Sequence, residues 1–529
     1  MITLTIDGTT VSVAEGTNLV EAAARAGIEI PTYCYHPGMT VVGQCRICFV
    51  EVEGMPRLVT GCSTPAQDGM AVSTTSERVR EARAAVMEFL LENHPLDCPV
   101  CDQAGECGLQ DYSVEHGLDT THMVDERRTY PGFERRMIGP HVVQNQNRCI
   151  HCTRCVRFTT EVSETADLTM KSRGNHSYID TFDAQPLDNP WSACVADVCP
   201  VGALTVKEFR FRARVWHLEE TPSVCPGCSI GCNIDLGHLD RVVHRFVPRT
   251  NAEINGWWMC DYGRFLAEGL NDREVERPLL RSDGRDHSMA WPTALEKLAD
   301  ELKNAPKPVV VASANLTNEA LFALKRNLVD GAHMEVVVPI HTGPTRRMKN
   351  GRGEWIESSA AHPNSSGARH LGLATADGAS LEAYIRDGAG PFLILDAHAH
   401  PWLTTDAAAA AIAGRWVAVL ARTRTPLVDA AAMVLPAASW AETEGTYTSS
   451  TGHIQLAKRA LAPQAQARPA WEVVFGLALA LGLEQERQVS PHILFAEMAA
   501  EVAAYRGLVW GGLTDGGPLP IRREVPGVG

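Results

Sequence analysis

Apolar and polar side chains alternate through the first residues of the chain, as they do in strands that bury one face. Residues 2–13 predict two strands around a turn at Asp7-Gly8. A short helix follows, with Asn18 and Glu21 at the spacing of a capping box. Two strands, a helix and then a loop that carries cysteines are typical of a small β-grasp domain.

Helical periodicity begins at residues 74–92, where Thr74 and Glu77 again have capping-box spacing. One face of this predicted helix is apolar and consists of Val79, Ala82, Val86, Phe89 and Leu90.

Beyond residue 278 the pattern changes to short apolar runs separated by alanine-rich helical stretches such as 293–303 and 404–413. Such runs are typical of parallel strands that are buried on both faces. Residues 341–370 are rich in Gly, Pro, Ser and Arg and predict a long loop. The predicted strands are Val309–Ala312, Val336–Val338, Phe392–Leu395 and Val417–Leu420.

A chain of 529 residues exceeds the size of a single core, so several domains are expected. No apolar stretch approaches the length of a membrane-spanning helix, and the strand pattern begins at Ile2 without a signal peptide before it. The net charge of −15 argues against a nucleic-acid partner. We therefore expect the protein in the cytosol or at a surface that faces it.

The number and spacing of the cysteines indicate what kind of site the chain contains. All 16 lie between Cys34 and Cys260, and dense Cys-x2-Cys spacings in a reducing compartment indicate metal or redox chemistry rather than disulfides. Their spacing defines four groups in chain order, which leave only Cys194 unassigned. The first group is Cys34, Cys45, Cys48 and Cys62; the second is His94, Cys98, Cys101 and Cys107; the third is Cys149, Cys152, Cys155 and Cys199; the fourth is Cys225, Cys228, Cys232 and Cys260.

The first group predicts a [2Fe–2S] cluster, because four thiolates can hold two irons and Cys45 and Cys48 form the close pair of a wrapping loop. The third group combines a compact C-x2-C-x2-C tripod with the remote Cys199-Pro200, a bacterial ferredoxin pattern whose last cysteine is displaced. Zinc does not favour such a tripod. The third group therefore predicts a [4Fe–4S] cluster.

The second group is ambiguous by itself, since three thiolates and one imidazole are also a common structural zinc set. In a chain that has cluster patterns on both sides, a cubane with only three thiolates favours His94 as its fourth ligand. The fourth group also predicts [4Fe–4S], with a zinc ribbon as the alternative. The other histidines, including His36, His151 and those beyond residue 333, have no partners at ligand spacing and predict no site.

Five stretches carry a family resemblance: GQCRICFVEV, NHPLDCPVCDQAGECGLQD, RCIHCTRCVRF, CPVGALT and RFRARVW. With the four groups in this order, residues 1–265 resemble the large iron–sulfur subunit, of G or 75-kDa type, of the proton-translocating NADH:quinone oxidoreductase, respiratory complex I. WPTALEKLA at 291 and VLPAASWAETEGTYTSSTGHIQ at 434–455 look like the molybdopterin-oxidoreductase domain of this subunit.

The resemblance implies a multidomain α+β and α/β fold, with one [2Fe–2S] and three [4Fe–4S] clusters and no molybdopterin. The expected domains are a β-grasp [2Fe–2S] domain at 1–75, a [4Fe–4S] segment with one histidine and three cysteine ligands at 76–120, a ferredoxin-like [4Fe–4S] domain at 138–215, a [4Fe–4S] domain of molybdopterin-oxidoreductase type at 221–277, and a truncated, inactive molybdopterin-oxidoreductase-like domain at 278–529.

The resemblance also implies an electron relay without catalytic residues or a substrate site of its own. Electrons would leave NADH through a flavin on an NADH-binding partner subunit and enter at the first group. They would pass to the third group and then the second, and exit to a ferredoxin-like [4Fe–4S] subunit that leads to quinone. The fourth group lies off this path in the family. The implied location is the cytoplasmic side of the bacterial inner membrane, with membrane contact only through other complex I subunits.

Three alternatives stay open. A molybdenum or tungsten formate dehydrogenase shares the four groups, but it has a lysine after the last cluster cysteine, where this chain has Asp261, and no cysteine follows Cys260 to bind the metal. A subunit of an NAD-linked hydrogenase is the second, although such chains normally stop near the third group. The third is a zinc-rich scaffold without redox function.

Overall fold

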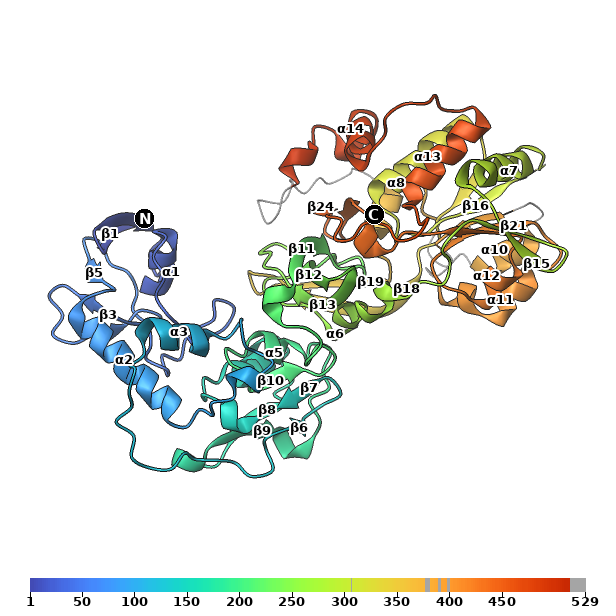
Figure 1. The fold of residues 1–529 in the computed structure, drawn as a ribbon. Coiled ribbons are helices and arrows are strands. Elements are labelled where there is room, and N and C mark those ends of the chain that lie inside the picture. Colours follow the sequence, from blue (N-terminus) through green and yellow to red (C-terminus); the bar gives the residue numbers. More distant parts are fainter. Residues whose placement is uncertain (306, 376–380, 389–391, 397–399, 514–529) are drawn as a thin grey trace. The chain divides into compact units, whose positions relative to one another are not determined.

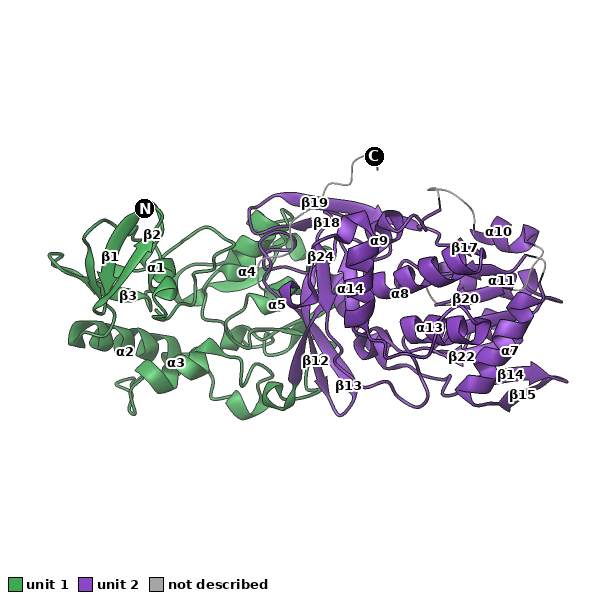
Figure 2. Cartoon of the chain, turned by 90° about the horizontal axis from the view of Figure 1, so that it is seen from above, with its two compact units in different colours: residues 1–218 green, residues 219–529 purple. Residues whose placement is uncertain are grey.

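The structure is a computed structural model that describes residues 1–305, 307–375, 381–388, 392–396 and 400–513. The chain divides into two compact units, residues 1–218 and 219–529, which are drawn in green and purple in Figure 2. Within the described ranges, no helix combines the length and the apolar character needed to span a bilayer.

The first unit begins with a five-stranded sheet in the order β2-β1-β5-β3-β4. Its strands β1, β3 and β5 are labelled in Figure 1. β1 and β2 pair antiparallel, and the Asn18 side chain caps α1 by accepting a hydrogen bond from the Glu21 N–H at 3.0 Å. The two predicted strands and the short helix are thus confirmed. The elements are β1 (Ile2–Ile6), β2 (Thr9–Val13), α1 (Leu19–Arg25), β3 (Phe49–Val52), β4 (Val59–Thr60) and β5 (Ala71–Ser73).

The second predicted helix is present as α2 (Glu77–Glu92), but it begins later than expected. Its N-cap is Ser76, whose hydroxyl accepts from the Val79 N–H at 3.4 Å. Thr74 instead donates its N–H to the Asp7 carboxylate at 2.8 Å, so it continues the end of β5 beside β1. The predicted apolar face is also wrong in part, because the Phe89 side chain is 74% exposed.

Short elements and loops complete the first unit, and they form the small sheets β10-β7-β6 and β8-β9. Loops leave backbone free to wrap around ligands, which suits the cysteine-rich part of the chain. The elements are α3 (Gly108–His116), β6 (Arg136–Met137), β7 (Val142–Gln144), α4 (Arg154–Arg157), the π-helix η3 (Phe158–Val162), β8 (Leu168–Lys171), β9 (Tyr178–Thr181), α5 (Cys194–Asp197) and β10 (Leu204–Val206).

The second unit contains a three-stranded sheet, β11-β12-β13, and a seven-stranded sheet in the order β15-β14-β22-β21-β20-β16-β17. The small sheet consists of β11 (Glu219–Val224), β12 (Asn233–Leu239) and β13 (Val242–Pro248), and α6 (Asp261–Phe265) follows it. The large sheet consists of β14 (Leu279–Ser282), β15 (Arg285–Ser288), β16 (Val309–Val311), β17 (Glu335–Val337), β20 (Phe392–Leu395), β21 (Val417–Ala421) and β22 (Met433–Pro436).

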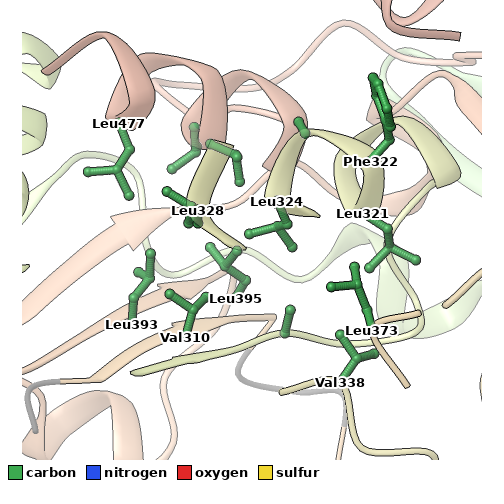
Figure 3. Packing of buried hydrophobic residues seen from close by; sticks show 14 of the residues in the cluster. Val310, Leu321, Phe322, Leu324, Leu328, Val338, Leu373, Leu393, Leu395 and Leu477 are labelled. Atoms are coloured by element: carbon green, nitrogen blue, oxygen red, sulfur yellow. The ribbon is translucent and has the colours of Figure 1, made fainter. Parts of the chain in front are cut away.

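Helices cover both faces of the large sheet. Figure 3 shows Val310, Leu393 and Leu395 of the strands beneath Leu321 and other leucines of the covering helix. The alternate strand residues, such as Val311 and Ile394, face a second core on the other side. The first face is covered by α7 (Trp291–Lys303), α8 (Asn318–Ala323), α13 (Ala470–Leu481) and α14 (Pro491–Glu501), and the second by α10 (Leu381–Asp387), α11 (Asp406–Ala411) and α12 (Pro426–Ala430).

The four predicted strands and their parallel pairing are confirmed as β16, β17, β20 and β21. The predicted long loop at 341–370 is wrong. This segment forms the antiparallel hairpin β18 (Thr342–Lys349) and β19 (Trp355–Ala360), followed by α9 (Ser365–His370). Another hairpin, β23 (Gly445–Thr448) with β24 (Ile454–Ala457), completes the unit.

Candidate metal centres

The first group gathers at loops beside the N-terminal sheet. Cys48 directly precedes β3 and Cys62 follows β4, and their Sγ atoms lie 3.4 Å apart. The Cys34 N–H donates to the Cys45 Sγ at 3.4 Å, and the Cys45 N–H donates to the Cys34 Sγ at 3.5 Å. Hydrogen bonds from Cys45 and Cys62 lower the pKa of the Cys34 thiol, whereas the bond to Cys34 raises the pKa of Cys62. The four sulfurs therefore form one interacting set.

The second group surrounds the end of α2 and the start of α3. His94 follows the C-cap of α2, and Cys107 is the N-cap of α3. The His94 Nδ1 atom is buried and has no hydrogen-bond partner among the described residues, and burial and the charge of Arg148 lower the His94 pKa to about 4. Burial, and to a lesser extent the charges of Cys101 and Cys98, raise the pKa of Cys107. A neutral imidazole with an unused nitrogen has the chemistry of a metal ligand.

Two arginines hold the loop of the second group. The Arg148 guanidinium donates from Nε and Nη2 to the Asp97 carboxylate at 3.0 and 2.9 Å. Arg214 donates to the carbonyl oxygens of Pro99 and Cys101, both at 2.6 Å. Charge-assisted bonds of this kind fix backbone more firmly than neutral bonds. The arginine-rich segment after β10 thus positions this loop.

The third group borders one small cavity. Left-handed backbone at His151 and Thr153 (φ 53° and 62°) turns the chain between the tripod cysteines. Burial raises the pKa of Cys149 to about 12 and that of Cys152 to about 11. Bound iron would reverse this effect, because a coordinating thiol is deprotonated outright. All four predicted thiols line the cavity, together with Gln144, Gln146, Ile150, Thr153, Ile179, Val201, Ala203 and Leu204.

The fourth group lies in the second unit, around the small sheet. Cys225 follows β11, Cys232 precedes β12, and Cys260 is the N-cap of α6, with its Sγ accepting from the Gly263 N–H at 3.5 Å. Burial raises the pKa of each of these thiols, and their mutual charges raise it further for three of them. The positive charge of Arg346 opposes this at three of the four sulfurs.

The donor chemistry of all four groups fits iron–sulfur ligation, since thiolates, with one imidazole, are the ligands that such clusters use. Two glycines leave room at the sulfurs. A β-carbon at Gly202 would lie 2.2 Å from the Cys101 Sγ, and one at Gly263 would lie 2.6 Å from the Cys225 Sγ. As the side chains stand in the described ranges, no three His, Cys, Asp or Glu residues are grouped so as to hold a metal ion by themselves.

Sequence reasoning missed several residues that contact these groups. Arg154 and Arg157 flank Cys155 in RCIHCTRCVRF, and Gly202 lies in CPVGALT, so the motifs contained a signal for them. Arg346 had none, because it lies in β18, within the segment that was predicted to be a loop. Its guanidinium stacks on the Tyr262 ring at 3.8 Å, two residues after Cys260.

A cavity of about 580 Å³ adjoins the fourth group in the second unit, and Pro226 and Tyr262 line it. Its charged lining includes Arg346, Arg422 and Asp396. Three of the histidines beyond residue 333, His341, His362 and His400, lie close to one another, and the first two line this cavity. The ring centroid of His341 lies 4.7 Å from that of His400 and 6.4 Å from that of His362.

Comparison with protein families places one iron–sulfur domain on each group. Residues 1–77 match a 2Fe-2S iron-sulfur cluster binding domain, and residues 83–122 match the NADH-ubiquinone oxidoreductase-G iron-sulfur binding region. Residues 139–205 match the ferredoxin-like domain of NADH-quinone oxidoreductase subunit 3. Residues 218–272 match the molybdopterin oxidoreductase Fe4S4 domain, and residues 407–480 match molybdopterin oxidoreductase.

Curated relatives agree with these domains. The G subunit of NADH-quinone oxidoreductase from Rickettsia conorii is 38% identical over 327 residues, which are 61% of this chain and 48% of the relative. The mitochondrial NADH-ubiquinone oxidoreductase 78 kDa subunit of Candida albicans is 42% identical over 300 residues, 56% of this chain and 41% of the relative. The chain resembles the G subunit of NADH-quinone oxidoreductase. It spans about half the length of these curated relatives.

The resemblance to this complex I subunit and the multidomain fold class predicted from the sequence are confirmed, as is the presence of both [2Fe–2S] and [4Fe–4S] domain types. Among solved structures, a chain of NAD+-reducing [NiFe]-hydrogenase in the H2-reduced state matches at 33% identity and a TM-score of 0.36, over 40% of this chain and 91% of that chain.

Proposed function

We propose that this chain is the iron–sulfur electron-transfer subunit of a proton-translocating NADH:quinone oxidoreductase. One observation carries the proposal: each of the four groups lies within a region that matches a different iron–sulfur domain. Three groups consist of four cysteines, and the second consists of His94 and three cysteines. The first group would hold a [2Fe–2S] cluster, and the other three would hold [4Fe–4S] clusters. The predicted ligands and domain boundaries are part of this proposal.

The residues of the chain would bind the clusters, keep them apart from water and set the charge around them. When bound, such clusters accept and release single electrons. Buried thiols exclude solvent from the third group, where Ile179, Val201 and Leu204 complete an apolar wall. Arg148 and Arg214 hold the loop of the second group in place. No residue of the chain has to transform a substrate in this role.

The proposed route enters at the first group, continues to the third and leaves from the second. The electron donor would be a flavin- and NADH-binding partner subunit, and the acceptor would be a ferredoxin-like [4Fe–4S] subunit that leads to quinone. Other complex I subunits would provide the membrane contact, on the cytoplasmic side of the bacterial inner membrane. The fourth group, which belongs to the second unit, would lie off this route.

The test is the metal content of the full chain purified without oxygen. We expect about 14 irons and a matching amount of acid-labile sulfide per chain, with little zinc. Cys225→Ala and Cys149→Ala should each remove about four irons, because each cubane needs its full ligand set. Roughly one zinc per group in place of iron would overturn the proposal.

Two further measurements, pterin extraction and co-purification from membranes, distinguish the proposed function from a formate dehydrogenase and from a hydrogenase complex. We expect no molybdenum, tungsten or pterin in the purified chain, no formate oxidation, and the membrane arm of a quinone reductase among the co-purified subunits. A stoichiometric pterin would favour a formate dehydrogenase. Co-purification with a nickel-containing partner would favour a hydrogenase complex.

A further inference from the structure

Two arginines of the short helix α4 connect the third group to the loop of the first group. Arg157 donates from Nη1 to the Thr40 carbonyl oxygen at 2.6 Å and from Nη2 to the carbonyl oxygen of Cys34. Arg154 donates from Nη2 to the carbonyl oxygen of Tyr35. Only 7% of Arg157 is exposed. Both arginines flank Cys155, a predicted ligand of the third group.

Further bonds join the same two segments. The Thr40 N–H donates to the Glu161 carboxylate at 2.8 Å, and the Thr40 hydroxyl donates to the same carboxylate. The Gln44 amide donates to the His151 carbonyl oxygen at 2.9 Å. The loop between Cys34 and Cys45 is therefore bonded on several sides to the segment that carries the tripod cysteines.

The two arginine charges lie near both groups. Arg154 and Arg157 flank Cys155 of the third group, and their guanidinium groups bond to carbonyl oxygens of the first group's loop, those of Tyr35, Cys34 and Thr40. A positive charge stabilises whichever neighbouring state is more negative.

We propose that Arg154 and Arg157 are positioning residues for electron transfer between the first and third groups, an inference that rests on the proposed function. In this step the [2Fe–2S] site loses one electron and the [4Fe–4S] site gains it, while a reduced flavin or a chemical reductant supplies the next. The hydrogen bonds would fix the separation of the two sites. The two charges would favour the reduced, more negative form of each site and so raise both reduction potentials.

The two effects can be separated by substitution in the full chain. Arg157→Met removes both the charge and the bonds, whereas Arg157→Lys keeps the charge but cannot bond to Cys34 and Thr40 with the same planar fork. Arg154→Met and Arg154→Lys form a second pair. Arg173→Met is the matched control, because Arg173 is an exposed arginine of the same unit.

The readouts are potentiometric EPR of both clusters, their magnetic interaction when both are reduced, and hydrogen exchange of backbone amides at residues 36–44. We expect the methionine variants to lower both potentials and to weaken the magnetic interaction. The lysine variants should restore the potentials, while amide exchange in the loop becomes about tenfold faster than in the wild type, because bonds to a charged donor are lost. The control should match the wild type in all three.

Unchanged potentials in both methionine variants, or unchanged loop exchange in both lysine variants, would overturn the inference. If a methionine variant loses iron, the lysine variant carries the test, because its loop exchange and magnetic interaction are still measurable. The failure of the proposed function would look different, since the wild-type chain itself would then contain zinc or no cluster.

Discussion

The α-carbon of Gly202 lies against the Sγ atom of Cys101, so closely that an added β-carbon would come within 2.2 Å of the sulfur. Cys101 belongs to the second group, whereas Gly202 follows Cys199 of the third group by three residues. Burial is the main cause of the raised pKa of Cys199, and the charge of Cys107 in the second group raises it slightly further. The two sites are therefore neighbours, and the backbone at Gly202 lies between them.

Gly202→Ala should damage the cluster of the second group. No β-carbon fits at 2.2 Å from a sulfur, so the added methyl group would displace the Cys101 thiol, one of the proposed ligands. We expect a loss of about four irons and a destabilisation of about 1–3 kcal/mol from overpacking. Iron analysis and low-temperature EPR measure the effect. Gly511→Ala is the control, since an added β-carbon there meets no atom within 4 Å. Wild-type spectra in Gly202→Ala would contradict this prediction and show that the Cys101 sulfur can make room without loss of the cluster.

Cys194 and Cys199 should behave differently when each is replaced by alanine. Cys199 lines the cavity of the third group, and its thiol donates to the Val201 carbonyl oxygen at 3.0 Å. Cys194 is fully buried in α5 and is absent from the residues that line the cavity. Cys199→Ala should remove about four irons, whereas Cys194→Ala should cost on the order of 1 kcal/mol and keep all of them. The opposite pair of EPR spectra would mean that the fourth ligand was assigned to the wrong cysteine.

Local sequence was sufficient for the features that depend on nearby residues. A run of four apolar residues predicted β20 with its bounds, because a strand buried on both faces needs an unbroken apolar segment. Asn18 predicted its own helix cap, since the bond spans three residues. The spacing of the third group predicted four thiols around one space, and they line one cavity.

Features that depend on distant residues could not be predicted. The hairpin of β18 and β19 was not predicted, because its Gly- and Arg-rich sequence has the composition of a loop. Its two strands pair with a register shift, which the sequence pattern does not mark. The bonds from Arg157 to Cys34 and Thr40 span more than 115 residues, and no periodicity marks them. Thr74 was a plausible helix cap from local sequence, but in the structure it follows the end of β5, and its N–H bonds to Asp7, which is 67 residues away.

Glu319 should make the stability of the second unit depend on pH. Its side chain is fully buried, and burial raises its pKa from 4.5 to about 7, although Thr446 donates to it from both N–H and hydroxyl. A raised carboxyl pKa means that the folded state binds the proton more tightly than the unfolded state. The contribution of Glu319 to stability should therefore be greatest below about pH 4.5, fall as pH rises from about 4.5 to 7, and stay lower above that, by roughly 3 kcal/mol in all.

Glu319→Gln should remove this dependence, because the glutamine is neutral at every pH and its carbonyl oxygen can still accept from Thr446. Unfolding midpoints at about pH 5 and about pH 7.5 measure the effect, with the exposed Glu357→Gln as the control. An equal drop between the two pH values in Glu319→Gln and in the wild type would show that another group is responsible.

His94 provides the sharpest test of the second group. Imidazole is neutral where thiolate is negative, so a cluster held by three cysteines and one histidine carries one negative charge less than an all-cysteine cluster. His94→Cys should therefore keep a four-iron cluster but lower its reduction potential relative to the wild type, as expected from the higher potentials of histidine-ligated Rieske centres. Electron transfer into this site should then become slower, because a cluster with a lower potential is a weaker electron acceptor.

His94→Ala should weaken or abolish the same cluster, because neither alanine nor the following Pro95 can supply a ligand. The buried Nδ1 atom of His94 has no hydrogen-bond partner in the described protein, which is the expected state of a nitrogen that binds metal. If His94 only completed the end of α2, both variants would retain nearly normal clusters and potentials. Low-temperature EPR of the reduced proteins distinguishes these cases, and an unchanged spectrum in His94→Ala would exclude histidine from the ligand set.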